Sequence, residues 1–199
     1  MQKHFIIIVF TLAGTLLPSM AADKQSSKTA EKTKPADQPV LTLCEAAKIG
    51  DIATIKVLLK NGTEIDDPDK KGKTPLMWAA ERGHIDTVKF LLEKKANVNA
   101  KSSSGWTALM SAAGGGKKEA ALLLIKKNAA INAQHHAGWT PLILAVLRGD
   151  LETVQLLVKK GAALNIKTSQ GMTAMDYASQ KKNGSEIVAF LKKATKKTN

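Results

Sequence analysis

The amino-acid sequence predicts an all-α fold, a solenoid of about five helix–turn–helix repeats with short β-turn or hairpin loops. A motif similar to Gly-x-Thr-Pro-Leu occurs four times at one constant interval, and its threonines are Thr74, Thr107, Thr140 and Thr173. Aromatic residues make up only 4% of the chain, so the core must consist of Leu, Ile, Val and Ala. This regular recurrence and this composition are typical of stacked repeats, each of which buries its apolar face against its neighbours.

The first helix of the unit is clearest in the stretch 69–100. Thr74 followed by Pro75 predicts a helix start, because the hydroxyl can accept a bond from a free backbone N–H and proline has no N–H to lose. Small apolar residues then share one helical face, namely Leu76, Ala79 and Ala80. The alanines allow a second helix to approach closely, and Gly83 ends the run.

A second helix is predicted by the apolar stripe that follows, at Ile85, Val88, Leu91 and Leu92. The residue after this helix is expected to adopt the left-handed conformation that commonly ends helices, and in successive copies it is Gly62, Lys95, Asn128 and Gly161. Lys95 is the exception, since Gly and Asn tolerate that conformation. Val98 and the turn former Asn99 then begin an extended return.

These residues resemble the ankyrin repeat, which recurs at the same interval as Thr74 and Thr107 and has a Thr-Pro-Leu-His-x-Ala core. The resemblance covers about Leu41 to Ala194 and implies the ankyrin-repeat solenoid fold. One position departs from the family pattern, because the histidine after Thr-Pro-Leu is replaced in successive copies by Met77, Met110, Ile143 and Asp176. In the family that histidine ties the helix to the turn, so we expect its loss to lower local stability more than it changes function.

Residues 1–21 have the pattern of a secretory signal peptide. Lys3 and His4 precede an apolar run from Phe5 to Leu17, and a small-x-small cleavage site ends at Ala21. The alternative is a permanent membrane anchor, which needs about 17–25 apolar residues. We therefore expect cleavage after Ala21, no integral membrane span in the cleaved protein, and export to the periplasm, with secretion as the alternative.

Residues 22–40 are polar and rich in Lys, Ser, Thr and Pro, which predicts a flexible linker because such a segment cannot bury enough apolar surface to fold. The ankyrin-repeat domain is expected to occupy 41–199, with repeats at about 41–68, 69–101, 102–134, 135–167 and 168–199. The first copy lacks the Gly-x-Thr-Pro start and the last is degenerate, as terminal repeats are when one face meets water. The tail from Thr195 is expected to be frayed.

No pattern for catalysis stands out, and we expect no enzyme activity, no cofactor and no metal ion. The stretch Gly114 to Lys118 lacks the spacing of a phosphate-binding loop, and its first two glycines predict a soft helix end instead. His135 and His136 are adjacent in a turn, so they do not converge as metal ligands do. Cys44, the single cysteine, is expected to be a partly buried small hydrophobe.

The net charge of +13 comes almost entirely from lysine, because the only arginines are Arg82 and Arg148. Nucleic acid is a disfavoured partner, since arginine is scarce and no nucleic-acid-binding module is present. Seven lysines recur near the ends of the predicted second helices, at Lys94, Lys126, Lys127, Lys159, Lys160, Lys192 and Lys193. These complement the helix dipoles. Alternatively, they form a lysine ridge that attracts anionic partners.

Ankyrin solenoids generally bind through turn tips and the exposed face of the first helices, so the resemblance indicates candidate binding residues. They are Lys70, Lys71, Lys73, Arg82, Trp106, His136, Trp139, Leu147 and Arg148. Because Trp106 and Trp139 occupy the same position in consecutive copies, we expect them to stand side by side, flanked by the two arginines, as the centre of a binding hot spot. The alternative is that both only pack on the neighbouring turn.

Together these patterns predict an exported monomer without catalytic activity that binds another protein, an acidic one among the candidates. The leader and the lysine-rich composition indicate the envelope of a Gram-negative bacterium. The chain is similar to periplasmic ankyrin-repeat proteins that support other envelope proteins, which is an analogy of fold. Two alternatives stay open: binding to the anionic envelope surface through the lysine ridge, and a secreted effector directed at a host.

Overall fold

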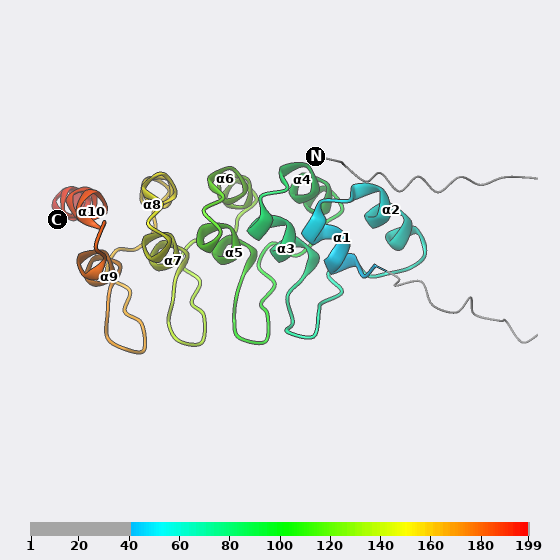
Figure 1. Cartoon of the computed structure of the whole chain (residues 1–199), viewed down its shortest axis with the longest axis horizontal. Coiled ribbons are helices and arrows are strands. Elements are labelled where there is room, and N and C mark those ends of the chain that lie inside the picture. Colours follow the sequence, from blue (N-terminus) through cyan, green and yellow to red (C-terminus); the bar gives the residue numbers. More distant parts are fainter. Residues whose placement is uncertain (1–40, 199) are drawn as a thin grey trace, which may run out of the picture. The chain divides into compact units, whose positions relative to one another are not determined.

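The computed structural model describes residues 41–198, in which ten α-helices follow one another as five helix pairs and no strand forms (Figure 1). The predicted all-α solenoid is therefore confirmed for this range, while the predicted signal peptide and linker lie outside the described residues. The helices are α1 Leu43–Ile49, α2 Ile52–Lys60, α3 Pro75–Arg82, α4 Ile85–Glu93, α5 Ala108–Gly114, α6 Lys118–Lys126, α7 Pro141–Arg148, α8 Leu151–Lys159, α9 Ala174–Gln180 and α10 Ser185–Thr198.

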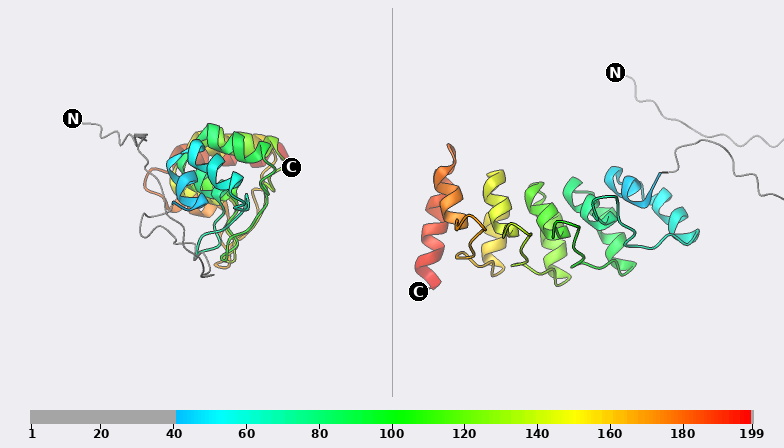
Figure 2. Two further views of the ribbon diagram at one scale, coloured as in Figure 1. Left: turned by 90° about the vertical axis from the view of Figure 1, so that its right-hand side faces the viewer. Right: turned by 90° about the horizontal axis from the view of Figure 1, so that it is seen from below.

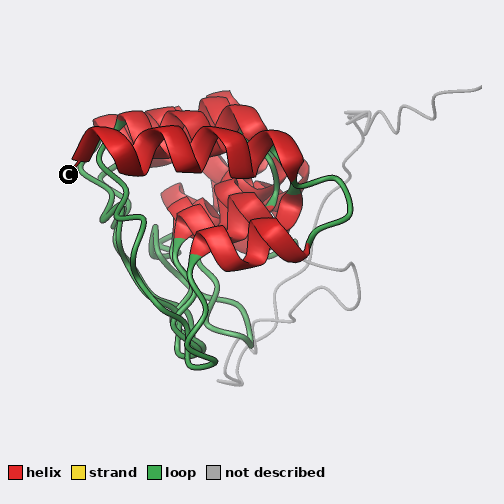
Figure 3. Cartoon of the chain, turned by 90° about the vertical axis from the view of Figure 1, so that its left-hand side faces the viewer, coloured by secondary structure: helices red, strands yellow, loops and turns green. Residues whose placement is uncertain are grey.

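The helices form two layers, and the loops project from one side of them (Figures 2 and 3). The first helices α1, α3, α5, α7 and α9 pack on one another in series, and α4, α6, α8 and α10 form the second layer. The inner layer can be close-packed because it is lined by alanines with no exposed surface, namely Ala46, Ala47, Ala79, Ala80, Ala112 and Ala113.

Threonine caps start the first helices as the motif predicts. The hydroxyls of Thr74, Thr107 and Thr140 accept a bond from the backbone N–H three residues later, at 3.3–3.4 Å. Pro75 and Pro141 occupy the first helical position, where the missing N–H costs nothing. In the first repeat, which lacks the full motif, Thr42 caps α1 through a reciprocal bond with Glu45.

The residues that replace the family histidine have structural roles of their own. Met77, Met110 and Ile143 are fully buried in the core. Asp176 accepts bonds from the Thr173 backbone N–H at 2.8 Å and from its hydroxyl at 2.7 Å, which completes a capping box on α9. Each replacement thus adds apolar burial or a cap where the family histidine would stand.

The turn tips are joined into a hydrogen-bonded row. Each turn closes on itself with a backbone bond of 2.9 Å, from 69 to 73, 102 to 106, 135 to 139 and 168 to 172. Neighbouring tips are linked by a second set of bonds, from the N–H groups of Ser103, His136 and Ser169 to the carbonyls of Lys71, Ser104 and Ala137 at 3.0–3.2 Å. This row holds the residues of four turns in fixed register.

A second row of bonds links the returns after the outer helices. The Asn99 side chain accepts a bond from the Ala130 backbone N–H at 2.8 Å, and Asn132 accepts one from Ala163 at 2.9 Å. Asp66 accepts the equivalent bond from Asn97 at 2.9 Å. Asn99 is thus more than the turn former expected from the sequence, because its side chain fastens one repeat to the next.

The second helices end as predicted in the left-handed conformation. The residues concerned are Gly62, Lys95, Asn128 and Gly161, with φ of 91°, 66°, 63° and 94°. The last helix is longer than the repeat pattern predicts, because α10 continues to Thr198. Lys192 and Lys193 therefore lie in the middle of α10 and not in its last turn, so the helix-dipole explanation does not hold for this pair.

Candidate functional site

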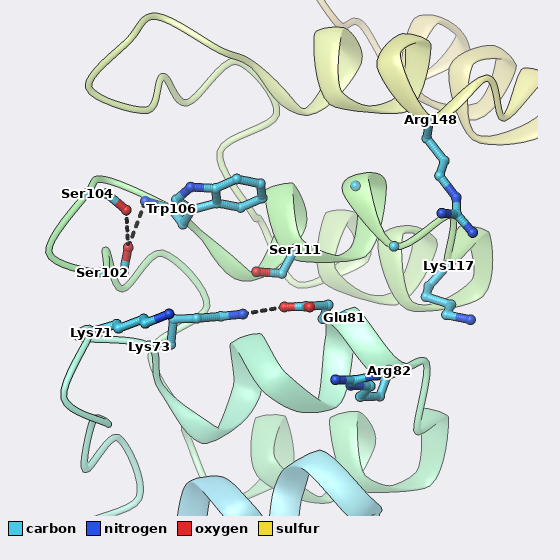
Figure 4. A pocket seen from close by; sticks show the side chains of 12 residues that line it. Lys71, Lys73, Glu81, Arg82, Ser102, Ser104, Trp106, Ser111, Lys117 and Arg148 are labelled. Atoms are coloured by element: carbon cyan, nitrogen blue, oxygen red, sulfur yellow. Dashed lines mark hydrogen bonds and ion pairs between the residues drawn. The ribbon is translucent and has the colours of Figure 1, made fainter.

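A groove of about 690 Å³ is lined by residues of three successive repeats (Figure 4). Its walls come from α3, α5 and α7, from the turns before α3 and α5, and from the α5–α6 loop. The lining residues are mainly basic or small: Lys71, Lys73, Glu81, Arg82, Ser102, Ser104, Trp106, Ser111, Gly114, Gly115, Lys117 and Arg148. The groove thus lies where the exposed face of the first helices meets the turn tips.

The structure brings together some of the candidate binding residues and separates others. Five of them line the groove, namely Lys71, Lys73, Arg82, Trp106 and Arg148. Lys70 lies on a neighbouring hollow that Cys44 and Trp78 also line. His136 and Leu147 are exposed outside the groove, and Trp139 is half-buried there.

Lys73 is held by its neighbours instead of standing free. Its ammonium forms an ion pair with Glu81 and lies 3.6 Å from the centroid of the Trp78 ring, and the side chain is only 16% exposed. The Trp78 indole donates in turn to Asp69 at 2.9 Å. Burial alone raises the pKa of Asp69, but the bonds from the Lys73 and Lys71 amides and from Trp78 lower it below its ordinary value.

Trp106 and Trp139, which were expected to stand side by side, both contact the ring of His135. The His135 ring meets Trp106 edge to face at 5.9 Å between centroids and stacks on Trp139 at 5.5 Å. Its Nδ1 accepts the Ala137 N–H at 3.0 Å, so the neutral ring carries its proton on Nε2. Burial, with a smaller contribution from His136, lowers the pKa of His135 and keeps the ring neutral. From the sequence, His135 was considered only as a metal ligand, and its position between the two tryptophans was not predicted.

The groove exists because the third repeat carries small residues where its neighbours carry large ones. When the copies are aligned on their threonines, Ser111 takes the place of Trp78 and Leu144, while Gly114 and Gly115 take the places of Glu81 and Arg82. The missing side chains leave the hollow that the flanking residues surround. The sequence contains this signal, but it becomes visible only when the side-chain volumes of the aligned copies are compared.

The two glycines are not equivalent. A Cβ on Gly115 would lie 2.5 Å from the Glu81 carbonyl oxygen, so glycine is required there for α5 to approach α3. A Cβ on Gly114 would meet the Trp106 ring at 3.7 Å, which is ordinary contact. The expectation of a merely soft helix end was therefore incomplete, because Gly115 is a close-packing position.

Lys117 also lines the groove, although the sequence did not predict it as a binding residue. It occupies the N-cap position of α6, where it makes no side-chain capping bond. In the equivalent positions Asp51 and Asp150 cap α2 and α8 by accepting from the backbone N–H three residues later. The aligned copies do contain an indication of this role, because the third copy has a lysine where the first and fourth have aspartate.

Cys44 is a buried small side chain, as expected. It is 5% exposed, and its thiol lies 3.3 Å from both the Asp67 and the Lys73 carbonyl oxygens. Burial, with the nearby negative charges of Asp69 and Asp67, raises the pKa of the Cys44 thiol to about 12. The thiol is therefore protonated near neutral pH and is a poor nucleophile.

Five of the seven lysines of the predicted ridge, Lys94, Lys126, Lys127, Lys159 and Lys160, lie at the ends of the outer helices α4, α6 and α8. Lys94, Lys127 and Lys160 are the C-caps of α4, α6 and α8, and all five side chains are exposed. Cations at these ends are favoured by the helix dipole. Between residues 41 and 198, no cluster of three or more His, Cys, Asp or Glu could hold a metal ion, and no helix is long and apolar enough to cross a membrane.

Comparison with known families gives one match. A model of ankyrin repeats (3 copies) matches residues 43–135 and 123–199, which is more than half of the chain. A search of curated proteins found no match. The match agrees with the fold described above and with the regular interval between the threonine motifs of the sequence.

Proposed function

The chain belongs to the ankyrin-repeat family, and on that premise we propose that it is a non-catalytic scaffold that binds another protein through its turn tips and the exposed face of its first helices. Ankyrin repeats generally mediate protein–protein binding. We propose further that it acts as a monomer in a bacterial envelope, with the periplasm as its location. The leader pattern of residues 1–21 supports export.

The groove across α3, α5 and α7 is the observation that carries the binding proposal. It is concave, it is continuous with the row of turn tips, and it holds five of the candidate residues named above. The hydrogen bonds between the tips fix this surface before a partner arrives. A preorganised surface loses little conformational freedom on binding, which favours affinity.

A pull-down from periplasmic extract tests the proposed surface. The double variant Trp106→Ala/Trp139→Ala is compared with the wild type and with Val57→Ala, which truncates a side chain on α2 that is 57% exposed. We expect the tryptophan variant to lose a partner that the wild type and the α2 control both retain. Equal recovery of every partner by all three proteins would reject this surface.

Cell fractionation and mass spectrometry test the proposed location. Export predicts a mature protein in the periplasm that begins after Ala21. Recovery from the culture medium would instead favour the secreted, host-directed alternative. An intact leader on a protein that stays in the cytoplasm would rule out both.

The exposure of the lysine ridge favours a second candidate function, binding to an anionic envelope surface. It predicts binding to vesicles of anionic lipid that weakens with salt and is lost in a Lys94→Gln/Lys127→Gln/Lys160→Gln variant. Vesicle binding that is absent, or that does not depend on salt, would remove this alternative.

A further inference from the structure

We propose that the groove between α3, α5 and α7 binds a carboxylate side chain from an acidic segment of the protein partner. Arg82, Lys117 and Arg148 lie along the path of this segment and attract its carboxylates, and the Ser111 hydroxyl donates to an acceptor oxygen from the floor of the groove. This inference rests on the proposed protein-binding function and specifies the chemistry of the partner.

The charges in the groove are unbalanced. Five cationic side chains line it, and its one carboxylate, Glu81, is already paired with Lys73. The side chains of Arg82, Lys117 and Arg148 form no ion pair or hydrogen bond with another residue in the described part of the chain. The whole sequence contains two arginines, and both line this groove. Arginine is the side chain best suited to hold a carboxylate, because its planar guanidinium offers two parallel donors.

Ser111 supplies an observation that does not depend on charge. The residue is 1% exposed, and within residues 41–198 its hydroxyl has no hydrogen-bond partner. A buried polar group without a partner is unfavourable, so such groups are rare in folded proteins. Figure 4 shows the Ser111 side chain pointing toward the space between the Trp106 ring and the Lys73–Glu81 pair. An acceptor oxygen in the groove would satisfy it.

Lys117 stands at an N-cap position where two of the three equivalent helices carry aspartate and the third carries His84. Aspartate caps the equivalent helices α2 and α8, whereas a cation at a helix N-terminus opposes the helix dipole. The Lys117 stem is nevertheless held in place, because it packs over Gly83, where a Cβ would lie 2.8 Å from the lysine Cδ. The equivalent residue of the second repeat, His84, packs over Gly50 in the same way, so the repeat fixes the position and Lys117 places a cation there, at the rim of the groove.

An acidic protein segment fits these features better than a small inorganic anion. The cations come from three repeats, so they follow a path along the groove and do not converge on one point as in a phosphate cradle. Trp106 adds an apolar wall beside the charges, which suits a side chain with an aliphatic stem. The net charge of +13 attracts an acidic partner over a distance.

Fluorescence anisotropy with a labelled glutamate-rich peptide tests the proposal on the purified protein. The matched peptide replaces every glutamate by glutamine. Arg148→Gln, Lys117→Gln and Ser111→Ala alter the groove, while Lys127→Gln and Lys160→Gln remove the same charge from the lysine ridge. Inorganic phosphate and a single-stranded oligonucleotide serve as competitors, and thermal unfolding verifies that each variant is folded.

The proposal predicts binding of the glutamate peptide and not of the glutamine peptide. Arg148→Gln is expected to weaken it about tenfold or more, because a bond to a charged group is lost. Ser111→Ala weakens it severalfold, and the ridge variants leave it within about twofold of the wild type. Equal binding of both peptides, equal losses in groove and ridge variants, or stronger binding of phosphate or the oligonucleotide would overturn the proposal.

The pull-down described above separates this inference from the function on which it rests. If the tryptophan variant loses a partner but the glutamate peptide does not bind, the carboxylate site is rejected and the scaffold function stands. If the peptide binds as expected but the tryptophan variant retains every partner of the wild type, the carboxylate site stands and the proposed docking surface is rejected.

Discussion

Three small residues of the third repeat, Ser111, Gly114 and Gly115, determine the character of the surface. They replace the larger side chains of the neighbouring copies and open the groove. The two glycines also differ from each other, because a Cβ has room at Gly114 but not at Gly115. Single substitutions at these positions can therefore separate effects on stability from effects on the groove.

Alanine at the two glycines should have opposite effects on stability. Gly115→Ala is expected to lower the free energy of unfolding by about 1–3 kcal/mol, because the new Cβ collides with the backbone of α3. Gly114→Ala is expected to raise it by about 0.5–1 kcal/mol, since the site has room and alanine favours the helix. Urea denaturation measures both, and a Gly115→Ala protein as stable as the wild type would contradict the packing argument.

Lys95 carries a strain that glycine would relieve. Its φ is 66°, in the left-handed region where Gly62 and Gly161 stand in other copies. Lys95→Gly is expected to raise the free energy of unfolding by about 1 kcal/mol. Lys94→Gly is the matched control, because Lys94 has an ordinary φ of −79° and glycine offers no relief there. Equal effects of the two substitutions would show that the left-handed conformation is not the cause.

The Cys44 thiol links stability to alkaline pH. Its pKa is raised from 9.0 to about 12 in the folded protein, so the unfolded chain loses its proton first as the pH rises. The unfolded state then binds fewer protons than the native state, and stability falls between about pH 9 and 12. We expect denaturation curves to show this loss in the wild type and a smaller loss in Cys44→Ala. The same pH profile in both proteins would contradict the assignment.

At the scale of the elements, the start of α6 shows a conflict between fold and binding. Lys117→Asp restores the cap found at Asp51 and Asp150, so it is expected to raise the free energy of unfolding by about 0.5–2 kcal/mol. The same change places a negative charge at the rim of the groove, so affinity for the glutamate peptide should fall. Calorimetry and anisotropy on one variant measure both effects. A variant that is more stable and binds the peptide at least as tightly as the wild type would argue against an anionic ligand.

The helices and their caps were predictable from the sequence, because each depends on local spacing that recurs in successive copies. The threonine caps, the left-handed residues and the buried alanines follow from that spacing. The length of α10 was not predictable, since its last residues depart from the repeat pattern. The place of His135 between Trp106 and Trp139 depends on how two turns pack, and the sequence spacing of the tryptophans does not contain that information.

At the scale of the whole molecule, the chain has two surfaces of different origin. The lysine ridge follows from the ends of the outer helices, where the helix dipoles favour cations. Arg82 and Arg148 also lie in the last turns of α3 and α7, where the helix dipole favours them, but the groove has two features that the dipole does not explain. Small residues of the third repeat open it, and the buried Ser111 hydroxyl lacks a hydrogen-bond partner within residues 41–198. A binding function is therefore better placed in the groove than on the ridge.

Lysine-labelling mass spectrometry on the protein with and without its captured partner tests the central claim most directly. The chain carries lysines on both surfaces, so one experiment compares them under identical conditions. Binding in the groove predicts that the partner protects Lys71 and Lys117 while Lys94, Lys127 and Lys160 are labelled as before. Protection of the three ridge lysines, with unchanged labelling at Lys71 and Lys117, would contradict it.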